Sequence, residues 1–147
     1  MKEVTNSTDE MKLLAERFIS SRSDTPRQRG TGALVIGLIG DLGAGKTTFA
    51  QGIAEALGVR DAVVSPTFTI ERIYKINHPH FSHLTHLDAY RLETSEELAH
   101  LGWDNLVSDE RALVLVEWAD RVREVLPADT LFVYFTLVTP TIHEVSY

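Results

Sequence analysis

The sequence from residue 40 to residue 48 reads Gly40-Asp41-Leu42-Gly43-Ala44-Gly45-Lys46-Thr47-Thr48. It contains Gly-x-x-x-x-Gly-Lys-Thr, a pattern typical of the P-loop that binds the phosphates of a nucleotide. Residues 33–39 before it are a branched apolar run, which predicts a buried strand. Residues 47–57 after it place Phe49, Ile53 and Leu57 at helical spacing. A strand, a glycine-rich loop and a helix in this order are the context that a working P-loop requires.

The residue types of this loop suit phosphate chemistry for separate reasons. Its glycines allow a tight turn and a close approach of the backbone to phosphate, because they carry no Cβ. Successive N–H groups and the start of the following helix point positive partial charge at an anion. The pattern predicts that Lys46 reaches the β and γ phosphates and that the Thr47 hydroxyl is a ligand of Mg²⁺.

The bulk properties of the chain restrict its class. With 147 residues, we expect a single domain, 1–147. It has no apolar run long enough to span a membrane, no signal-peptide pattern at its N-terminus and no cysteine, which together favour the cytoplasm. The net charge of −7 disfavours autonomous nucleic-acid binding, so a role on RNA would be indirect, through a partner protein.

Together with the P-loop, the helices and strands predicted in the rest of the chain indicate a three-layer α/β/α fold of the P-loop NTPase type, with a mostly parallel central sheet. An antiparallel hairpin, formed by residues 68–76 and 81–88, is expected as an insertion. A capping box at Ser7–Glu10 predicts a helix to about Ser20. Further expected elements are a helix at 96–101 capped by Thr94 or Ser95, a strand at 113–116, a helix at 120–126, a strand at 131–138 and an edge strand at 142–147.

Two carboxylates are candidates for holding a metal ion near the P-loop. Glu117 follows the apolar run 113–116, and Asp88 ends the returning strand of the hairpin. Ligands in open α/β sheets bind beyond the carboxyl ends of the strands, which is where both residues are expected. Either carboxylate can instead be a cap or a solvated strand end, and the P-loop favours the metal-side interpretation.

Aromatic and basic residues near these positions have two interpretations each. Trp118 is either a core aromatic at the end of a strand or a flat platform for adenine. Arg91 and Arg121 either face the γ-phosphate or pair with surface carboxylates. Four histidines lie around the hairpin turn, and strand alternation divides their directions, so we expect solvated residues rather than a metal site. They are His78, His80, His83 and His86.

Taken together, these segments resemble the bacterial TsaE (YjeE) ATPases, which act in threonylcarbamoyladenosine modification of tRNA. The matching segments are 40–49, Ser-Pro-Thr-Phe at 65–68, His-Leu-Asp-Ala-Tyr-Arg at 86–91, Glu-Glu-Leu at 96–98 and Val-Glu-Trp at 116–118. The resemblance covers essentially residues 5–138. Residues 139–147 lack the basic residue and the glycine that family members generally show there, which argues against a nucleotide or partner contact from this end.

The resemblance implies a Mg²⁺-dependent ATPase and a set of site residues. Residues implied to contact the nucleotide are Gly43, Ala44, Gly45, Lys46, Thr47, Thr48 and Trp118. Residues implied to be catalytic are Lys46, Asp88 and Glu117, with Thr47, Asp88 and Glu117 around the metal. Segment 65–68 resembles a switch-like loop that senses the γ-phosphate. The implied partners are TsaD and TsaB, so tRNA is reached indirectly.

Two other functions remain open beside the coupled ATPase. One is a small P-loop metabolite kinase, although the segment after Arg91 is too short for a convincing lid. The other is a nucleotide-dependent docking module in which hydrolysis is incidental, because a switch and a slow ATPase use the same residues. A GTPase is disfavoured because the sequence has no Asn-Lys-x-Asp signature, and an ABC-type ATPase because it has no Leu-Ser-Gly-Gly signature.

Overall fold

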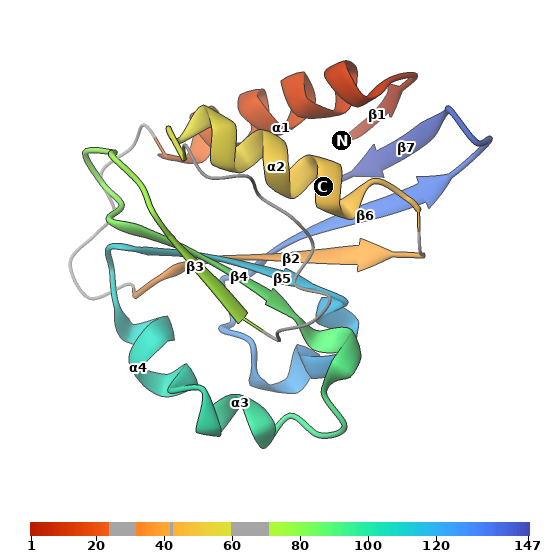
Figure 1. The fold of residues 1–147 in the computed structure, drawn as a ribbon. Coiled ribbons are helices and arrows are strands. Elements are labelled where there is room, and N and C mark those ends of the chain that lie inside the picture. The colour runs from red at the N-terminus through yellow and green to blue at the C-terminus, as the bar shows by residue number, and fades with distance from the viewer. Residues whose placement is uncertain (24–31, 42, 60–70) are drawn as a thin grey trace.

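The computed structural model describes residues 1–23, 32–41, 43–59 and 71–147 of the chain. These residues form a seven-stranded sheet with the strand order β1-β7-β6-β2-β5-β4-β3 (Figure 1). The strands are β1 (Lys2–Thr5), β2 (Leu34–Gly40), β3 (Glu71–Lys75), β4 (His83–Asp88), β5 (Ala112–Glu117), β6 (Leu131–Leu137) and β7 (His143–Ser146).

The four central strands of the sheet, β6, β2, β5 and β4, run parallel to one another. On one side β3 pairs antiparallel with β4, which confirms the predicted hairpin. On the other side β7 pairs antiparallel with β6, and β1 with β7. Every residue of β5 is buried, as expected for a strand that is covered on both faces. The predicted fold class, with a mostly parallel centre and an antiparallel hairpin, is confirmed.

Helices cover both faces of the sheet, so the fold has three layers (Figure 1). One face carries the two long helices, α1 (Thr8–Ser23) and α2 (Lys46–Ala56). The opposite face carries the short elements η1 (Ala89–Arg91), α3 (Glu97–His100), α4 (Trp103–Ser108) and η2 (Ala119–Val125). Among the described residues, no helix is both long enough and apolar enough to cross a bilayer.

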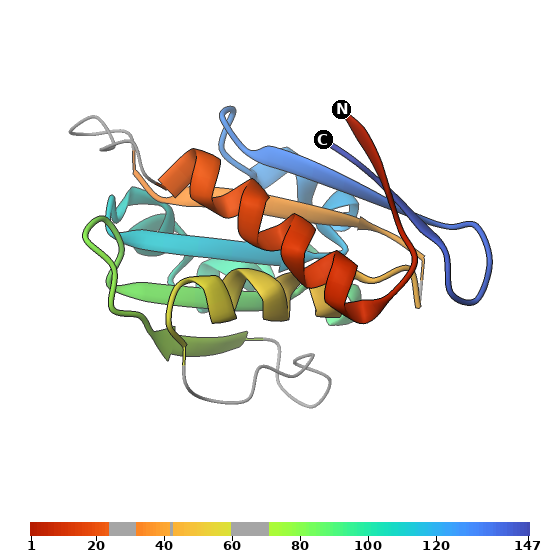
Figure 2. The ribbon, with the colours of Figure 1, turned by 90° about the horizontal axis from the view of Figure 1, so that it is seen from above.

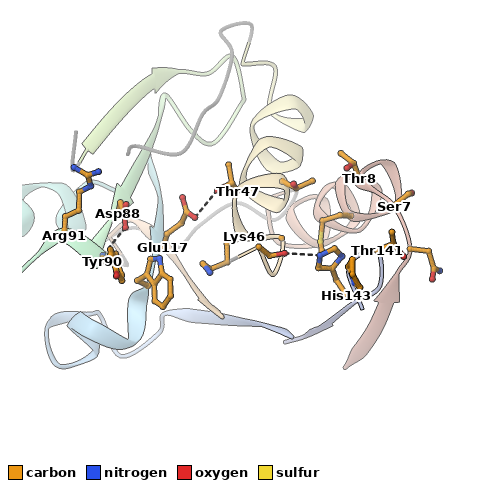
Figure 3. A pocket seen from close by; sticks show the side chains of 17 residues that line it. Ser7, Thr8, Lys46, Thr47, Asp88, Tyr90, Arg91, Glu117, Thr141 and His143 are labelled. Carbon is orange, nitrogen blue, oxygen red and sulfur yellow. Dashed lines mark hydrogen bonds between the residues drawn. The ribbon is translucent and has the colours of Figure 1, made fainter. Parts of the chain in front are cut away.

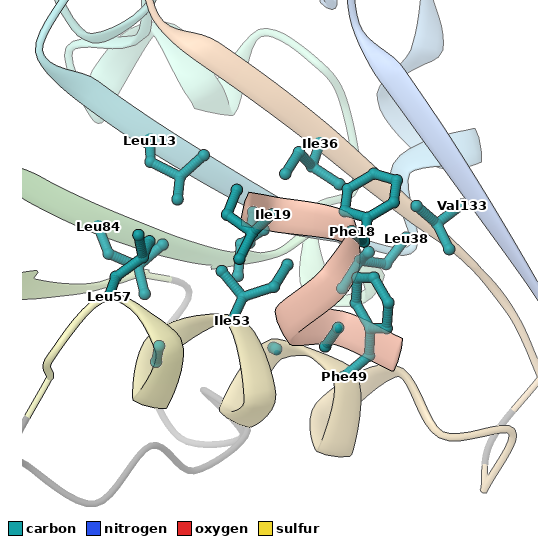
Figure 4. Packing of buried hydrophobic residues seen from close by; sticks show 14 of the residues in the cluster. Phe18, Ile19, Ile36, Leu38, Phe49, Ile53, Leu57, Leu84, Leu113 and Val133 are labelled. Carbon is teal, nitrogen blue, oxygen red and sulfur yellow. The ribbon is translucent and has the colours of Figure 1, made fainter. Parts of the chain in front are cut away.

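The larger core lies between the sheet and the pair α1 and α2, which lie side by side across it (Figure 2). Phe18 of α1 meets Phe49 of α2 edge to face, with ring centroids 5.5 Å apart. Ile53 and Leu57 continue the apolar face of α2 toward the sheet (Figure 4). Burial of a side chain of this size contributes about 1.5–3 kcal/mol. The helical spacing read from the sequence therefore identified the face of α2 that packs on the sheet.

A close approach of the two helices occurs at Gly52. A Cβ at this position would lie 2.8 Å from Ala15 Cβ and 2.9 Å from Lys12 Cα, which is backbone. The absence of a side chain lets α1 and α2 pack at this distance. Because α2 follows the P-loop directly, this contact helps to hold the loop against the N-terminal helix.

The first turn of α1 has the predicted capping residues. Ser7 Oγ accepts a hydrogen bond from Glu10 N at 3.1 Å. The Glu10 carboxylate reaches back to Asn6 N at 2.6 Å, one residue earlier than in the standard capping box. The helix continues to Ser23, beyond the expected end at Ser20. These two hydrogen bonds cap the start of α1.

The sequence-based expectations are wrong at some elements. The strand expected at 142–147 exists as β7, but it is not an edge strand because β1 covers it. Neither β1 nor α4 was predicted. The helix expected at 96–101 begins after Glu96, and Glu97 accepts from the N–H groups of Glu93 and Thr94, so neither Thr94 nor Ser95 is the cap. The segment 65–68 lies outside the described residues.

Candidate active site at the P-loop

The P-loop connects β2 to α2 in the conformation that its glycines permit. Gly43 and Gly45 have φ angles of 77° and 104°, a region that residues with a Cβ rarely adopt. Gly45 is the N-cap of α2, and Phe49 N donates to its carbonyl at 2.9 Å. The N-terminus of α2 therefore opens directly onto the loop, where backbone N–H groups favour an anion.

Lys46 is the first residue of α2 and is 5 % exposed. Its ammonium donates to the carbonyl oxygens of Gly40 and, at 2.7 Å, Asp41. Burial lowers the pKa of Lys46, and the nearby carboxylates of Glu117 and Asp41 oppose that shift. The ammonium of Lys46 is thus held inside the loop by two backbone carbonyls.

Thr47 and Glu117, 70 residues apart in sequence, meet beside the loop. Thr47 Oγ1 donates to Glu117 Oε1 at 3.2 Å (Figure 3). β2 and β5 pair in parallel, so their carboxyl ends lie side by side. Glu117, the last residue of β5, therefore lies next to the end of β2, where the P-loop begins. The sheet therefore brings together two of the three residues that were predicted to surround a metal ion.

Asp88 is the third of these residues, and it is the register partner of Glu117 between β4 and β5. Its Oδ1 accepts a hydrogen bond from Tyr90 N at 3.0 Å, which caps η1. Burial raises the pKa of Asp88; the Tyr90 hydrogen bond lowers it, and the charge of Glu117 adds to the increase. Asp88 therefore caps η1, and it also lies close enough to Glu117 to be a carboxylate of the site.

His86 corrects one expectation about the histidines. It is fully buried, and its Nε2 lies 2.7 Å from Glu117 Oε2. Because an ionised carboxylate only accepts hydrogen bonds, Nε2 is the donor. In the described part of the chain, His86 Nδ1 has no hydrogen-bond partner. The assignment of His86 as a solvated residue is wrong, since β4 is covered on both faces.

The other three hairpin histidines are partly exposed: His78, His80 and His83. His80 N donates to His78 Nδ1, and the two rings lie 5.6 Å apart. Within the described ranges, no cluster of three or more acidic or histidine side chains is arranged to hold a metal ion. Mg²⁺ in nucleotide sites is usually bound by one or two carboxylates together with substrate phosphates, so the pair Asp88 and Glu117 fits this ion.

Trp118 follows Glu117 with a φ of 57°, a left-handed backbone that is unusual for a residue with a side chain. Its ring lies 4.4 Å from Lys46 Nζ and 5.0 Å, centroid to centroid, from the ring of Tyr90. Strained backbone of this kind clusters at functional sites. The indole thus lies against the ammonium of Lys46 and lines the same cavity.

A cavity of about 780 Å³ joins these residues. Of the predicted nucleotide-contacting residues, Ala44 alone does not line it; it is fully buried. Arg91 lines the cavity, whereas Arg121 does not and donates weakly to Leu92 O at 3.5 Å. The volume is in the range of small-molecule sites.

One wall of the cavity was missed by the sequence analysis. It consists of the start of α1 and the turn between β6 and β7, with Ser7, Thr8, Met11, Thr141 and His143 (Figure 3). His143 Nε2 donates to the Gly43 carbonyl at 3.1 Å, so the C-terminal segment touches the P-loop itself. Nothing in the local pattern of residues 139–147 signals this contact, because it depends on the strand order.

Comparison with known proteins agrees with this geometry. The family model described as "Threonylcarbamoyl adenosine biosynthesis protein TsaE" matches residues 5–142. The chain is 32% identical over 136 residues to the tRNA threonylcarbamoyladenosine biosynthesis protein TsaE of Rickettsia bellii, covering 92% of this chain and 85% of that protein. It is 45% identical over 97 residues to the protein of the same name from Bacillus subtilis.

The match to the Bacillus subtilis protein covers 66% of this chain and 58% of the relative. A similar match to the Streptomyces coelicolor protein covers 62% of that relative. The crystal structure of Bacillus subtilis YdiB superposes with a TM-score of 0.74 at 30% identity, covering 99% of this chain and 82% of that one. With its P-loop, its three-layer fold and these matches, the chain belongs to the TsaE family of nucleotide-binding P-loop proteins.

Proposed function

We propose that this chain binds ATP with Mg²⁺ and hydrolyses it in support of threonylcarbamoyladenosine modification of tRNA. The observation that carries the proposal is the contact of Thr47 Oγ1 with Glu117 Oε1 beside the buried ammonium of Lys46. It places a P-loop hydroxyl, a strand-end carboxylate and a cation around one point. A phosphate chain needs this combination for binding and for charge stabilisation.

The phosphates are proposed to lie on the loop from Gly43 to Thr48. Backbone N–H groups at the start of α2 hold their oxygens, and Lys46 exchanges its bonds to the Gly40 and Asp41 carbonyls for phosphate oxygens. Burial of Lys46 leaves its charge weakly solvated, so the gain from contact with an anion is large. Trp118 covers this ammonium and keeps water from it.

The residues around Thr47 fit a magnesium ion. Thr47 Oγ1 would be one ligand, and Glu117 or Asp88 would bind through a carboxylate oxygen or through water. When bound, Mg²⁺ would neutralise charge that develops on the β and γ phosphate oxygens. The carboxylate that is not engaged with the ion is left to orient the attacking water. Lys46, Asp88 and Glu117 are in this way the proposed catalytic residues.

The partners are proposed to be proteins of the TsaD and TsaB type, which act on tRNA in the cytoplasm. The names of the matched relatives refer to tRNA threonylcarbamoyladenosine biosynthesis. The net charge of −7 supports an indirect role on tRNA, because a direct role would require a basic surface. All 147 residues are proposed to act as one domain.

The test is ATP hydrolysis by the purified chain alone and with added TsaD and TsaB, with Lys46→Ala as the control. Stimulation by the partners that is lost in the Lys46 variant supports the proposal. Hydrolysis that the partners leave unchanged, or transfer of phosphate to a small hydroxylated acceptor, contradicts it and favours a kinase.

The variant Glu117→Ala separates the coupled ATPase from a docking module. Glu117 contacts Thr47 but not the loop backbone in the described hydrogen bonds, so its loss should reduce hydrolysis more than ATP binding. If tRNA modification falls in proportion to hydrolysis, turnover is required. If modification persists while hydrolysis is lost, ATP occupancy alone controls docking.

A further inference from the structure

Tyr90 is an aromatic residue at the rim of the P-loop cavity that the proposed chemistry does not use. Its side chain is 52 % exposed, yet it lines the same cavity as Lys46 (Figure 3). The residues that anchor η1 in the core are Ala89 and Leu92, both of which are buried. Tyr90 therefore contributes little to the core, and its contacts lie at the site.

The ring of Tyr90 lies against the indole of Trp118. The two centroids are 5.0 Å apart and the planes are inclined by 47°. Aromatic pairs at this distance attract each other beyond the effect of apolar burial. The indole in turn lies 4.4 Å from Lys46 Nζ. Three side chains thus form a continuous row from the rim of the cavity to the buried ammonium.

The observed conformation of Trp118 has to be held by its surroundings. Its φ of 57° is unfavourable for a residue with a Cβ, and such strain persists only where neighbouring structure fixes it. The backbone is fixed by η2, because Arg121 N donates to the Trp118 carbonyl at 3.0 Å. This bond does not fix the indole. Among the described residues, Tyr90 is the aromatic ring that packs on it.

Tyr90 is itself held from two elements. Its N–H donates to Asp88 Oδ1 at 3.0 Å, at the end of β4. The guanidinium carbon of Arg121, in η2, lies 5.4 Å from the ring centroid, in cation–π range. Among the described residues these contacts involve the ring and the backbone N–H of Tyr90, and none involves its hydroxyl. The ring is therefore the part of Tyr90 that can hold the indole.

The place of the indole matters because Lys46 is the cation that would meet the phosphates. The face of an indole attracts an ammonium and favours its charged form. It also keeps water away, and a charge in a poorly solvated place attracts an anion more strongly. An indole that turned away would leave Lys46 more solvated and phosphate binding weaker.

We propose that Tyr90 is a positioning residue for phosphate binding, whose ring holds the indole of Trp118 against the ammonium of Lys46. This inference rests on the proposed function, since it takes a triphosphate chain as the ligand of Lys46. Tyr90 acts through Trp118 and not on the nucleoside. Its effect is therefore the same for every ligand that has this phosphate chain.

The first test compares ATP with inorganic tripolyphosphate, which has the phosphate chain and no nucleoside. Dissociation constants for both, with Mg²⁺, are measured by calorimetry. We expect Tyr90→Leu to weaken both ligands by the same factor, about two- to tenfold, the size of one aromatic pair contact. Tyr90→Phe keeps the ring and should retain the affinity. The matched control is Tyr134→Leu, an exposed tyrosine beside Phe132 and Arg123 that does not line the cavity.

A double-mutant cycle tests whether Tyr90 acts through Trp118. In the Trp118→Leu background, the further change Tyr90→Leu should weaken neither ligand, because the side chain that it positions is gone. The same loss with and without Trp118 overturns the inference. A loss confined to ATP also overturns it, since that result indicates a direct contact of Tyr90 with the nucleoside.

A second measurement reads Lys46 in the ligand-free protein. Acetic anhydride attacks a neutral amine, whereas the indole favours the ammonium and covers it. The acetylation rate of Lys46 relative to the exposed Lys2, followed by mass spectrometry, should rise about two- to tenfold in Tyr90→Leu and not in Tyr90→Phe. Equal rates in both variants and in the unaltered protein overturn the inference. If the unaltered protein binds neither ATP nor tripolyphosphate, the proposed function fails, which is a different result.

Discussion

His86 Nε2 lies 2.7 Å from Glu117 Oε2, and this pair is buried between β4 and β5. The other oxygen of the same carboxylate accepts from Thr47. Both oxygens of Glu117 are therefore held, one from the sheet and one from the P-loop. His86 is one of the side chains that set the direction of the proposed catalytic carboxylate, although it does not line the cavity itself.

His86 is expected to act as a positioning residue for Glu117. In His86→Gln the amide nitrogen reaches about as far as Nε2 and can donate the same hydrogen bond, whereas in His86→Asn it matches only the nearer Nδ1 position. We expect kcat to fall in the Asn variant and to be largely retained in the Gln variant, with the ATP dissociation constant unchanged in both. Steady-state kinetics and calorimetry measure the two quantities.

His86→Ala should also reduce stability, because it leaves a buried carboxylate with one partner fewer. The expected loss in the free energy of unfolding is about 3 kcal/mol, measured by urea denaturation. His80→Ala, at the partly exposed hairpin turn, should cost much less. If His86→Gln and His86→Asn lose kcat equally, the hydrogen bond to Glu117 is not what positions the carboxylate.

Thr47 is expected to act through its hydroxyl alone. Thr47→Val has nearly the same shape without the hydroxyl, and Thr47→Ser keeps the hydroxyl without the methyl group. We expect the Mg²⁺ concentration for half-maximal hydrolysis to rise about tenfold or more in Thr47→Val, the scale on which metal sites respond to changes of close neighbours. Titration of Mg²⁺ at fixed ATP measures it. Equal behaviour of Thr47→Ser and Thr47→Val would show that Thr47 is not a ligand.

Asp88 should make stability depend on pH. Burial raises the pKa of Asp88 in the folded chain, so the folded state binds a proton more tightly than the unfolded state. The free energy of unfolding therefore loses a contribution as pH rises through the folded pKa. Asp88→Asn, which can still accept from Tyr90 N, should be more stable than the unaltered protein at pH 7. This difference should shrink as pH falls through the folded pKa and vanish only about one pH unit below the ordinary aspartate pKa of about 3.9, where Asp88 is protonated in both states.

Urea unfolding of the metal-free protein across this pH range is the measurement for Asp88. Asp104→Asn, on the exposed surface of α4, is the control for removal of a carboxylate as such. A gain in Asp88→Asn that is the same at pH 4 and at pH 7 would rule out the raised pKa as its cause.

Gly52 should resist a substitution that usually stabilises helices. Replacement of glycine by alanine in a helix interior normally gains about 1 kcal/mol. At Gly52 the added Cβ would meet Lys12 Cα at 2.9 Å, and backbone cannot move aside as a side chain does. Gly52→Ala is therefore expected to lose about 1–3 kcal/mol, the usual cost of overpacking. Thermal unfolding measures it, and a rise in melting temperature would contradict the packing of α1 on α2.

The P-loop, the buried strands and the parallel centre of the sheet were predictable because their signals are local. Gly40–Thr48 is contiguous, and the apolar run 113–116 marks a strand covered on both faces. Glu117 and Asp88 followed from one rule, that ligands lie at the carboxyl ends of such strands. His86 was misjudged, because strand alternation divides residues between two faces without telling whether both are covered.

The nucleotide loop, its two candidate carboxylates and the resemblance to the TsaE family could all be read from the sequence. Each of these three features depends on short sequence segments with fixed spacing. The tertiary structure alone decided that β7 is covered by β1 and that His143 touches Gly43, 100 residues away. It also decided that His86 holds Glu117. These contacts depend on the order and register of strands, which arise from packing of the whole chain and leave no periodic signal in any one segment.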